Sequence, residues 1–136
     1  MIFLSLRQTL TIVAVAGSAV LLVAGCRGSG ASTSPVISIE PEVLPQPVRV
    51  GPATIILNVA DASRKPLTGA RINLEGIMSH PGMAPSFGKA SETAPGRYQA
   101  PLEFTMAGDW IIVVHLTLGD GRQVEKQFEV KGVRSD

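Results

Sequence analysis

The chain has 136 residues, of which 45% are hydrophobic and only 4% aromatic, and its 12 basic and 11 acidic side chains nearly balance. This length corresponds to one domain of ordinary size. The charges form no basic stripe, so we do not expect nucleic acid as a partner. The single cysteine, Cys26, excludes an intramolecular disulfide bond.

The first 25 residues have the pattern of an export signal. Arg7 is the only charged residue among them, and an apolar stretch runs from Leu10 to Ala24. A charged segment followed by a short apolar one is typical of a secretory signal peptide. The apolar run is short for a permanent membrane span, and an uncleaved anchor is the alternative. We therefore expect residues 1–25 to be a signal peptide.

The end of this stretch, Val23-Ala24-Gly25-Cys26, resembles a lipobox, the cleavage signal of bacterial lipoproteins. The resemblance implies that Cys26 receives acyl chains such as palmitate and becomes the first residue of the mature chain. Two or more acyl chains anchor a protein durably, whereas one does not. We therefore expect an extracytoplasmic lipoprotein, held by Cys26 on a periplasmic or cell-surface membrane face.

Residues 26–35 are rich in Gly and Ser and contain no large apolar side chain. Such a composition is typical of a flexible tether. Residues 36–136 are then expected to form the folded domain.

In this domain apolar and polar residues alternate with a period of two, which is typical of half-buried antiparallel strands. The first segment contains several prolines and is expected to be an edge strand. A Gly119-Asp120-Gly121 sequence between two alternating runs predicts a hairpin. The pattern predicts strands over residues 36–44, 54–59, 70–75, 98–105, 110–118 and 124–130. We expect an all-β fold, a single Ig-like antiparallel sandwich of about seven strands, with a small barrel as the alternative.

The segment from Gly76 to Glu92 interrupts the alternation and is expected to be one long loop. Long ordered loops in small domains are usually functional. Within it, Met78, His80 and Met83 bring two thioethers and an imidazole into six residues. These neutral, soft donors suit Cu(I) better than Zn, Mg or Ca. The sequence therefore predicts a copper site, with core packing as the alternative for Met78.

Two further residues are candidates to complete this site. Met106 precedes Trp110 in an expected turn, and His115 lies in the middle of an expected strand. The alternative for His115 is an ordinary strand histidine. We expect a binding protein and no enzyme, because the sequence has no recognisable nucleophile, acid–base pair or HExxH motif.

Four segments together resemble the YtkA-like domain family: residues 65–70, the Met78–Met83 loop, Gly96-Arg97-Tyr98, and residues 104–110. The resemblance covers about residues 50–130 and implies an exported or membrane-anchored Ig-like sandwich. It also implies a role beside copper-handling or oxidase-maturation systems. The family's Met/His loop corresponds to Met78, His80 and Met83, and its Met-x-Gly-x-Trp feature to residues 106–110.

Two functions follow as hypotheses. The first is a tethered lipoprotein that binds or transfers Cu(I), with an envelope copper protein or an oxidase assembly factor as its partner. The second is an interaction module without a metal, which docks on another envelope protein through its loop or an edge strand. In the second case Met83 and Phe87 are the expected contact residues.

Overall fold

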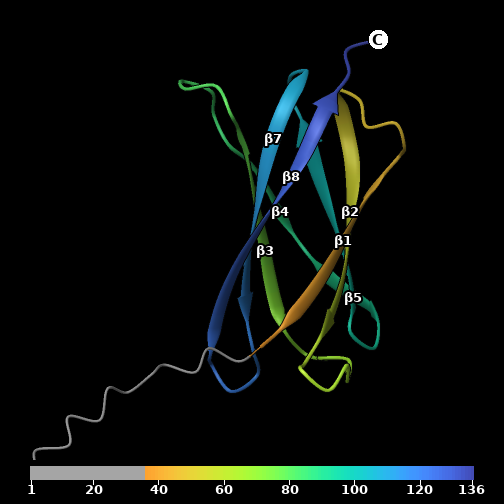
Figure 1. Cartoon of the computed structure of the whole chain (residues 1–136), viewed down its shortest axis with the longest axis vertical. Coiled ribbons are helices and arrows are strands. Elements are labelled where there is room, and N and C mark those ends of the chain that lie inside the picture. Colours follow the sequence, from red (N-terminus) through yellow and green to blue (C-terminus); the bar gives the residue numbers. More distant parts are fainter. Residues whose placement is uncertain (1–35) are drawn as a thin grey trace, which may run out of the picture. The chain divides into compact units, whose positions relative to one another are not determined.

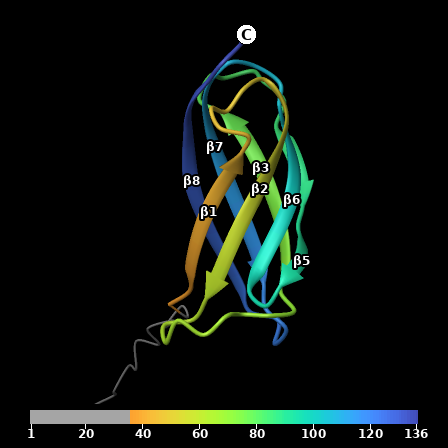
Figure 2. The same cartoon turned by 90° about the vertical axis from the view of Figure 1, so that its right-hand side faces the viewer.

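The alternating segments form two antiparallel sheets in the computed structural model, which describes residues 36–136. One sheet has the strand order β1-β2-β6-β5 and the other β4-β3-β7-β8, and the two face each other (Figures 1 and 2). The expected signal peptide of residues 1–25, Cys26 and the expected tether of residues 26–35 lie outside the described residues. The strands are β1 Ser38–Leu44, β2 Gly51–Ala60, β3 Arg71–Met78, β4 Ser86–Lys89, β5 Ser91–Ala94, β6 Arg97–Phe104, β7 Gly108–Thr117 and β8 Gln123–Val133.

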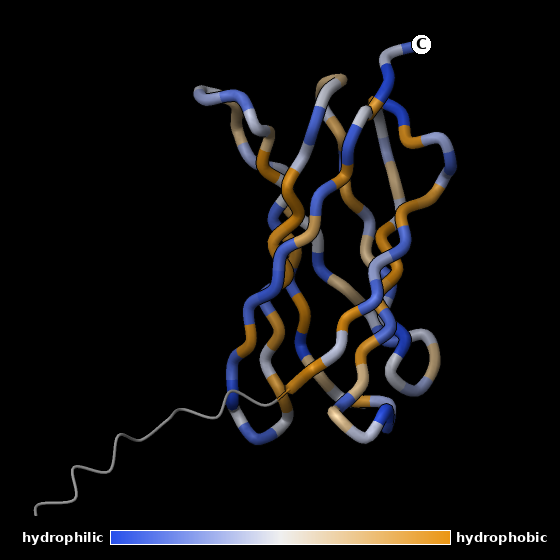
Figure 3. The backbone as a smooth tube through the Cα atoms, in the orientation of Figure 1, coloured by the Kyte–Doolittle hydropathy of each residue, from blue (hydrophilic) through white to orange (hydrophobic). Residues whose placement is uncertain are grey.

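This strand order confirms the predicted Ig-like sandwich. In immunoglobulin domains the first, second, fifth and fourth strands form one sheet, and the third strand heads the other. Here β1, β2, β6 and β5 correspond to the first sheet, and β4 is an added strand beside β3. The alternation of apolar and polar residues along each strand is visible in Figure 3.

The prediction of one loop from Gly76 to Glu92 was wrong. β3 continues to Met78, and the short strands β4 and β5 follow, so the connection between β3 and β4 covers only residues 79–85. β4 pairs with β3, whereas β5 pairs with β6, so the chain changes sheets near Ala90. Both strands have only four residues and few large apolar side chains, so they show no readable alternation. Their pairing depends on neighbours distant in sequence.

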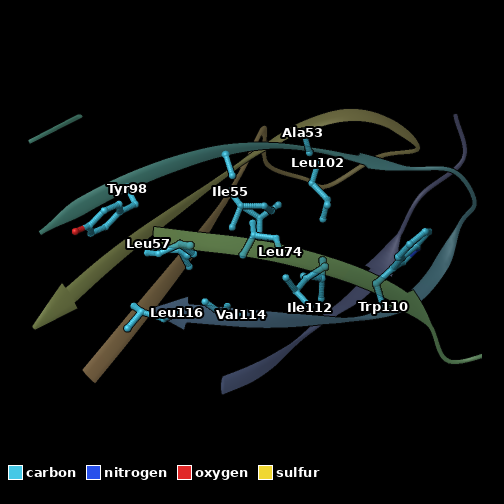
Figure 4. Close-up of a cluster of buried hydrophobic side chains, with 14 of the residues drawn as sticks. Ala53, Ile55, Leu57, Leu74, Tyr98, Leu102, Trp110, Ile112, Val114 and Leu116 are labelled. Carbon is cyan, nitrogen blue, oxygen red and sulfur yellow. The ribbon is translucent and has the colours of Figure 1, made fainter. Parts of the chain in front are cut away.

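The core fills the space between the two sheets. The largest fully buried side chains include Trp110, Tyr98 and Phe104, and the rings of Phe104 and Trp110 meet edge to face at 5.3 Å. Figure 4 shows Tyr98 and Trp110 at opposite ends of this core. Every member of the core cluster lies between Ile37 and Val133. The two sheets of residues 36–136 therefore enclose one continuous core.

Two contacts join the sheets at their edges. On one side the end of β8 meets the segment before β2, where the Val50 N–H donates to the Arg134 carbonyl at 2.8 Å. On the other side β4 lies against β6 so closely that a Cβ on Gly88 would be 2.3 Å from the Pro101 carbonyl oxygen. These contacts limit how far the sheets can slide.

The register of the strands determines which loops share an end. Met78 at the end of β3 pairs with Trp110 near the start of β7, so the β3–β4 loop and the β6–β7 turn lie at the same end. β1 begins at the opposite end of the sandwich (Figure 1). Within residues 36–136 no helix is long and apolar enough to cross a membrane.

Candidate metal site

Met78 lies close to Gly108 in the chain segment that follows Met106. Met78 is only 7% exposed and belongs to the core cluster, as its alternative interpretation predicted. A Cβ on Gly108 would be 3.2 Å from the Met78 Cε methyl. The missing side chain at Gly108 therefore lets the thioether of Met78 lie directly under the turn that carries Met106.

Trp110 fixes the conformation of this turn. Its indole Nε1–H donates to the Met106 carbonyl at 3.0 Å, while the residue itself is only 1% exposed. Because the backbone of Met106 is held, its side chain, which is 44% exposed, lies on the surface above Trp110. A buried indole usually has such a hydrogen-bond partner.

The β3–β4 loop is attached to the turn at its first residue. The backbone N–H and the hydroxyl of Ser79 both donate to the Asp109 carbonyl at 3.2 Å. The Asp109 carboxylate in turn accepts from the Gly132 N–H at 2.9 Å. Asp109 lies opposite a β-bulge of β8, where two residues, Lys131 and Gly132, face this single residue of β7.

Asp109 is the residue of this site that sequence reasoning missed. It lies in the segment before Trp110 that was expected to be a turn, and Asp beside Gly is common in turns. The available signal was Gly132 after the last alternating run, because an isolated Gly in a strand pattern is compatible with a bulge. The pairing with Ser79 and Gly132 is visible only in the folded chain.

The tip of the loop carries the two remaining candidates. His80 is exposed, Met83 is 39% exposed, and Gly82 adopts a φ of 90° that favours glycine. In Figure 1 this loop projects away from the sandwich. His80 and Met83 thus share an end with Met78 and Met106, but they lie on a segment that stands off from the β6–β7 turn.

His115 is not brought to this end. It lies on β7 five residues beyond Trp110, which corresponds to about 16 Å along a strand. On the outer face of the sheet its Nε2 is 3.5 Å from a Glu75 carboxylate oxygen, and its Nδ1 is 3.3 Å from one of Glu125. The structure therefore separates His115 from the methionines and agrees with its interpretation as an ordinary strand histidine.

The donors that gather at this end are thioethers and one imidazole. In the described part of the chain no three His, Cys, Asp or Glu side chains are grouped so that they could hold a metal ion. The sulfur atoms of Met78, Met83 and Met106 are soft, neutral donors of the kind that Cu(I) accepts. Two of these residues belong to the packed sandwich: Met78 at the end of β3 and Met106 in the β6–β7 turn. The other two, His80 and Met83, lie on the projecting loop.

Comparison with known proteins identifies the family. The family model described as YtkA-like matches residues 38–115, which is more than half of the chain. A search of curated proteins found no match. Among solved structures, murine CRIg is similar over 74% of this chain and 98% of its own, with 14% sequence identity and a TM-score of 0.42. Because the family match spans residues 38–115, the chain belongs to the YtkA-like family.

Proposed function

We propose that this protein is a membrane-tethered, extracytoplasmic domain that binds Cu(I) and passes it to a partner. The observation that carries the proposal is the grouping of three methionines and His80 at one end of the sandwich. These residues come from the end of β3, the β3–β4 loop and the β6–β7 turn, so segments distant in sequence converge there. Exposed methionines are otherwise uncommon on the surface of a small domain.

In this proposal the site has a fixed part and a moving part. The Met106 carbonyl accepts a hydrogen bond from Trp110, and Met78 lies against Gly108, two residues farther along the chain. The β3–β4 loop would bring His80 and Met83 toward Met78 and Met106. Its first residue, Ser79, is held by its hydrogen bond to Asp109. An ion held by two or three neutral ligands remains accessible from solvent, so a partner's ligands can replace them one at a time.

The position of the site suits transfer away from the membrane. β1 begins at the end of the sandwich opposite the β3–β4 loop (Figure 1). A tether that leads from a lipid on Cys26 into β1 would therefore present the methionine end outward. An envelope copper protein or an oxidase assembly factor is the proposed recipient.

A Cu(I) titration of residues 36–136 against a competing chelator tests the proposal. Met83→Leu, Met106→Leu and His80→Ala should each weaken Cu(I) binding about tenfold or more, because each removes one ligand. Leucine keeps nearly the volume of methionine, so the packing changes little. Met78→Leu should also weaken Cu(I) binding, and leucine should still fill the space that Met78 occupies in the core. His115→Ala is the matched control and should bind Cu(I) as the unchanged protein does.

Trp110 offers a second readout, because it is the only tryptophan of the chain and lies directly beneath Met106. Cu(I) at the proposed site should change its emission in a one-to-one titration. Equal, weak Cu(I) binding by all variants, with no change in Trp110 emission, would contradict the proposal.

The second candidate function is docking on an envelope protein without a metal. Its support is the exposed apolar surface of this region, where Phe87 is 70% and Met83 39% exposed. The leucine variants separate the two functions, because leucine removes the sulfur and keeps the apolar surface. Docking should survive Met83→Leu and be lost in Phe87→Ser. Cu(I) binding should instead be weakened by Met83→Leu and unchanged by Phe87→Ser.

A further inference from the structure

Two edge strands, β1 and β8, lie on the same side of the sandwich and leave a groove between the sheets (Figure 2). In the described part of the chain β1 pairs only with β2, and β8 pairs only with β7 until a bridge just beyond its end. Two adjoining hollows of about 420 and 300 Å³ follow this side and share Pro41 and Phe128. The name β1–β8 groove is used below for the surface formed by Ile37, Ile39, Pro41, Lys126, Phe128 and Val130.

The floor of the β1–β8 groove is apolar and continuous with the core. Ile37 and Val130 are buried members of the core cluster, whereas Ile39 and Phe128 are only partly buried and pack against it. Solvent therefore reaches the margin of the core along this side. Apolar side chains placed here from outside would remove further apolar surface from water, which is favourable.

The free edge of β8 has the backbone groups that an added strand needs. At its far end this edge already accepts another segment: the Arg134 N–H donates to the Val48 carbonyl at 3.1 Å, and the Arg134 carbonyl accepts from the Val50 N–H at 2.8 Å. An extended peptide that joins a sheet edge in this way is held mainly by such backbone hydrogen bonds. β1 is less suitable, because Pro41 has no N–H to donate.

Lys126 is a charged side chain in the inward-facing row of β8. It lies opposite the fully buried Val114 and between Val124 and Phe128, which both pack against the core. Lys126 is exposed, and within residues 36–136 no carboxylate forms an ion pair with it. A strand on this edge would cover the ammonium group, at a cost in free energy unless it met an opposite charge. Inward charges on edge strands reject unsuitable strands for this reason.

From this combination we propose that the free edge of β8 binds an extended segment of a partner protein, and that Lys126 selects a segment with a carboxylate. Alternate side chains of the added strand would enter the β1–β8 groove. An Asp or Glu would lie opposite Lys126, with an apolar side chain on each side of it, beside Val124 and Phe128. A segment with an apolar or basic residue at the central position is rejected, because Lys126 would then be covered without a counter-charge.

This surface is separate from the proposed copper site. Lys126 lies level with Val114, four residues along β7 from Trp110, which corresponds to about 13 Å. The β3–β4 loop, with His80 and Met83, belongs to the opposite edge of the same sheet. Strand binding at β8 therefore needs neither Cu(I) nor the methionines, and the Cu(I) titration and the experiment below can fail independently.

A probe strand joined to the C-terminus of the full-length protein tests the proposal. The probe Thr-Val-Thr-Glu-Thr-Val-Thr has its Glu between two valines on one face, and a Gly/Ser linker after Asp136 keeps it at a high effective concentration. Two control probes carry Gln or Lys in place of Glu. With the Glu probe, the β8 amides at the free edge should exchange hydrogen about tenfold more slowly than in the protein without a probe. The Gln probe should protect them less, and the Lys probe should not protect them.

A charge exchange at Lys126 is the decisive comparison. In Lys126→Glu the preference should invert, so that the Lys probe protects β8 and the Glu probe does not. Lys89→Glu is the matched control, because it makes the same change of charge on β4, at the other edge of the sheet, and should keep the preference for the Glu probe. Absence of protection by the Glu probe would overturn strand binding at β8. Equal protection by all three probes would overturn the selection by Lys126.

Discussion

Tyr98 connects the core to the long segment between β2 and β3. Its hydroxyl donates to the Leu67 carbonyl at 2.8 Å and accepts from the Ala70 N–H at 3.0 Å. The residue is only 1% exposed, so its removal from water adds apolar stabilisation to these two bonds. The sequence predicted the buried ring, because Tyr98 is in phase with aliphatic neighbours, but not the bonds to Leu67 and Ala70 on a distant segment.

Burial of its hydroxyl raises the pKa of Tyr98 to about 12, and the neighbouring Glu92 carboxylate adds to this effect. The unfolded chain has a tyrosine pKa near 10, so the folded state holds the proton more tightly. This stabilisation is complete below pH 10 and is lost as the pH rises from about 10 to 12. We expect the free energy of unfolding to fall by about 2–3 kcal/mol across this window.

Tyr98 is the only tyrosine of the chain, so phenolate absorbance reports on it alone. Urea unfolding at several pH values, with Tyr98→Phe as the control, measures the linkage. The phenylalanine variant should be less stable below about pH 10 and lose less stability above it. A Tyr98 that titrates near pH 10 in the folded protein would contradict this expectation.

At the scale of elements, β4 is one of the two strands that the sequence pattern did not predict. It pairs with β3 over Asn73–Gly76 and also lies against β6, where the Glu103 N–H donates to the Ser86 hydroxyl at 3.3 Å. Its four residues contain a single large apolar side chain, Phe87, which faces outward. Its position thus depends on backbone pairing and on the absence of a side chain at Gly88.

Gly88→Ala should destabilise the domain by about 1–3 kcal/mol, because the new Cβ would be 2.3 Å from the Pro101 carbonyl oxygen. Relief requires β4 to move away from β6, so hydrogen exchange should increase in β4. Gly119→Ala is the matched control, because its Cβ would meet nothing within 4 Å. Thermal unfolding compares the two, and equal stability of the variants would show that β4 tolerates this shift.

At the scale of the whole molecule, membrane attachment depends on Cys26 in our proposal. Cys26→Ala should remove the acyl chains and leave residues 1–25 on the chain, because lipidation and cleavage act at this residue in lipoproteins. Mass spectrometry of the membrane-bound protein measures both changes. Ser29→Ala in the tether is the control and should be processed normally. Detection of unmodified Cys26 behind an intact residue 1–25 segment in the unchanged protein would favour an uncleaved anchor.

The sequence by itself determined the all-β class, most of the strands and the family. Alternation such as that of residues 98–105 and 110–118 is a local property, because each side chain's face follows from its own position along the strand. The types of candidate ligand, two thioethers and an imidazole between Met78 and Met83, are likewise present in the sequence as it stands.

Only the tertiary structure decided which of these residues meet. It placed Met78 against Gly108, two residues from Met106, and His115 on the outer face between Glu75 and Glu125. It also joined Asp109 to Ser79 by hydrogen bonds. It also aligned β4 with β3 to complete the outer face. These outcomes depend on strand register and on close backbone approach between distant segments. Local periodicity determines which face of the sheet each residue takes, but not which strand it pairs with, because a strand keeps the same pattern beside every partner.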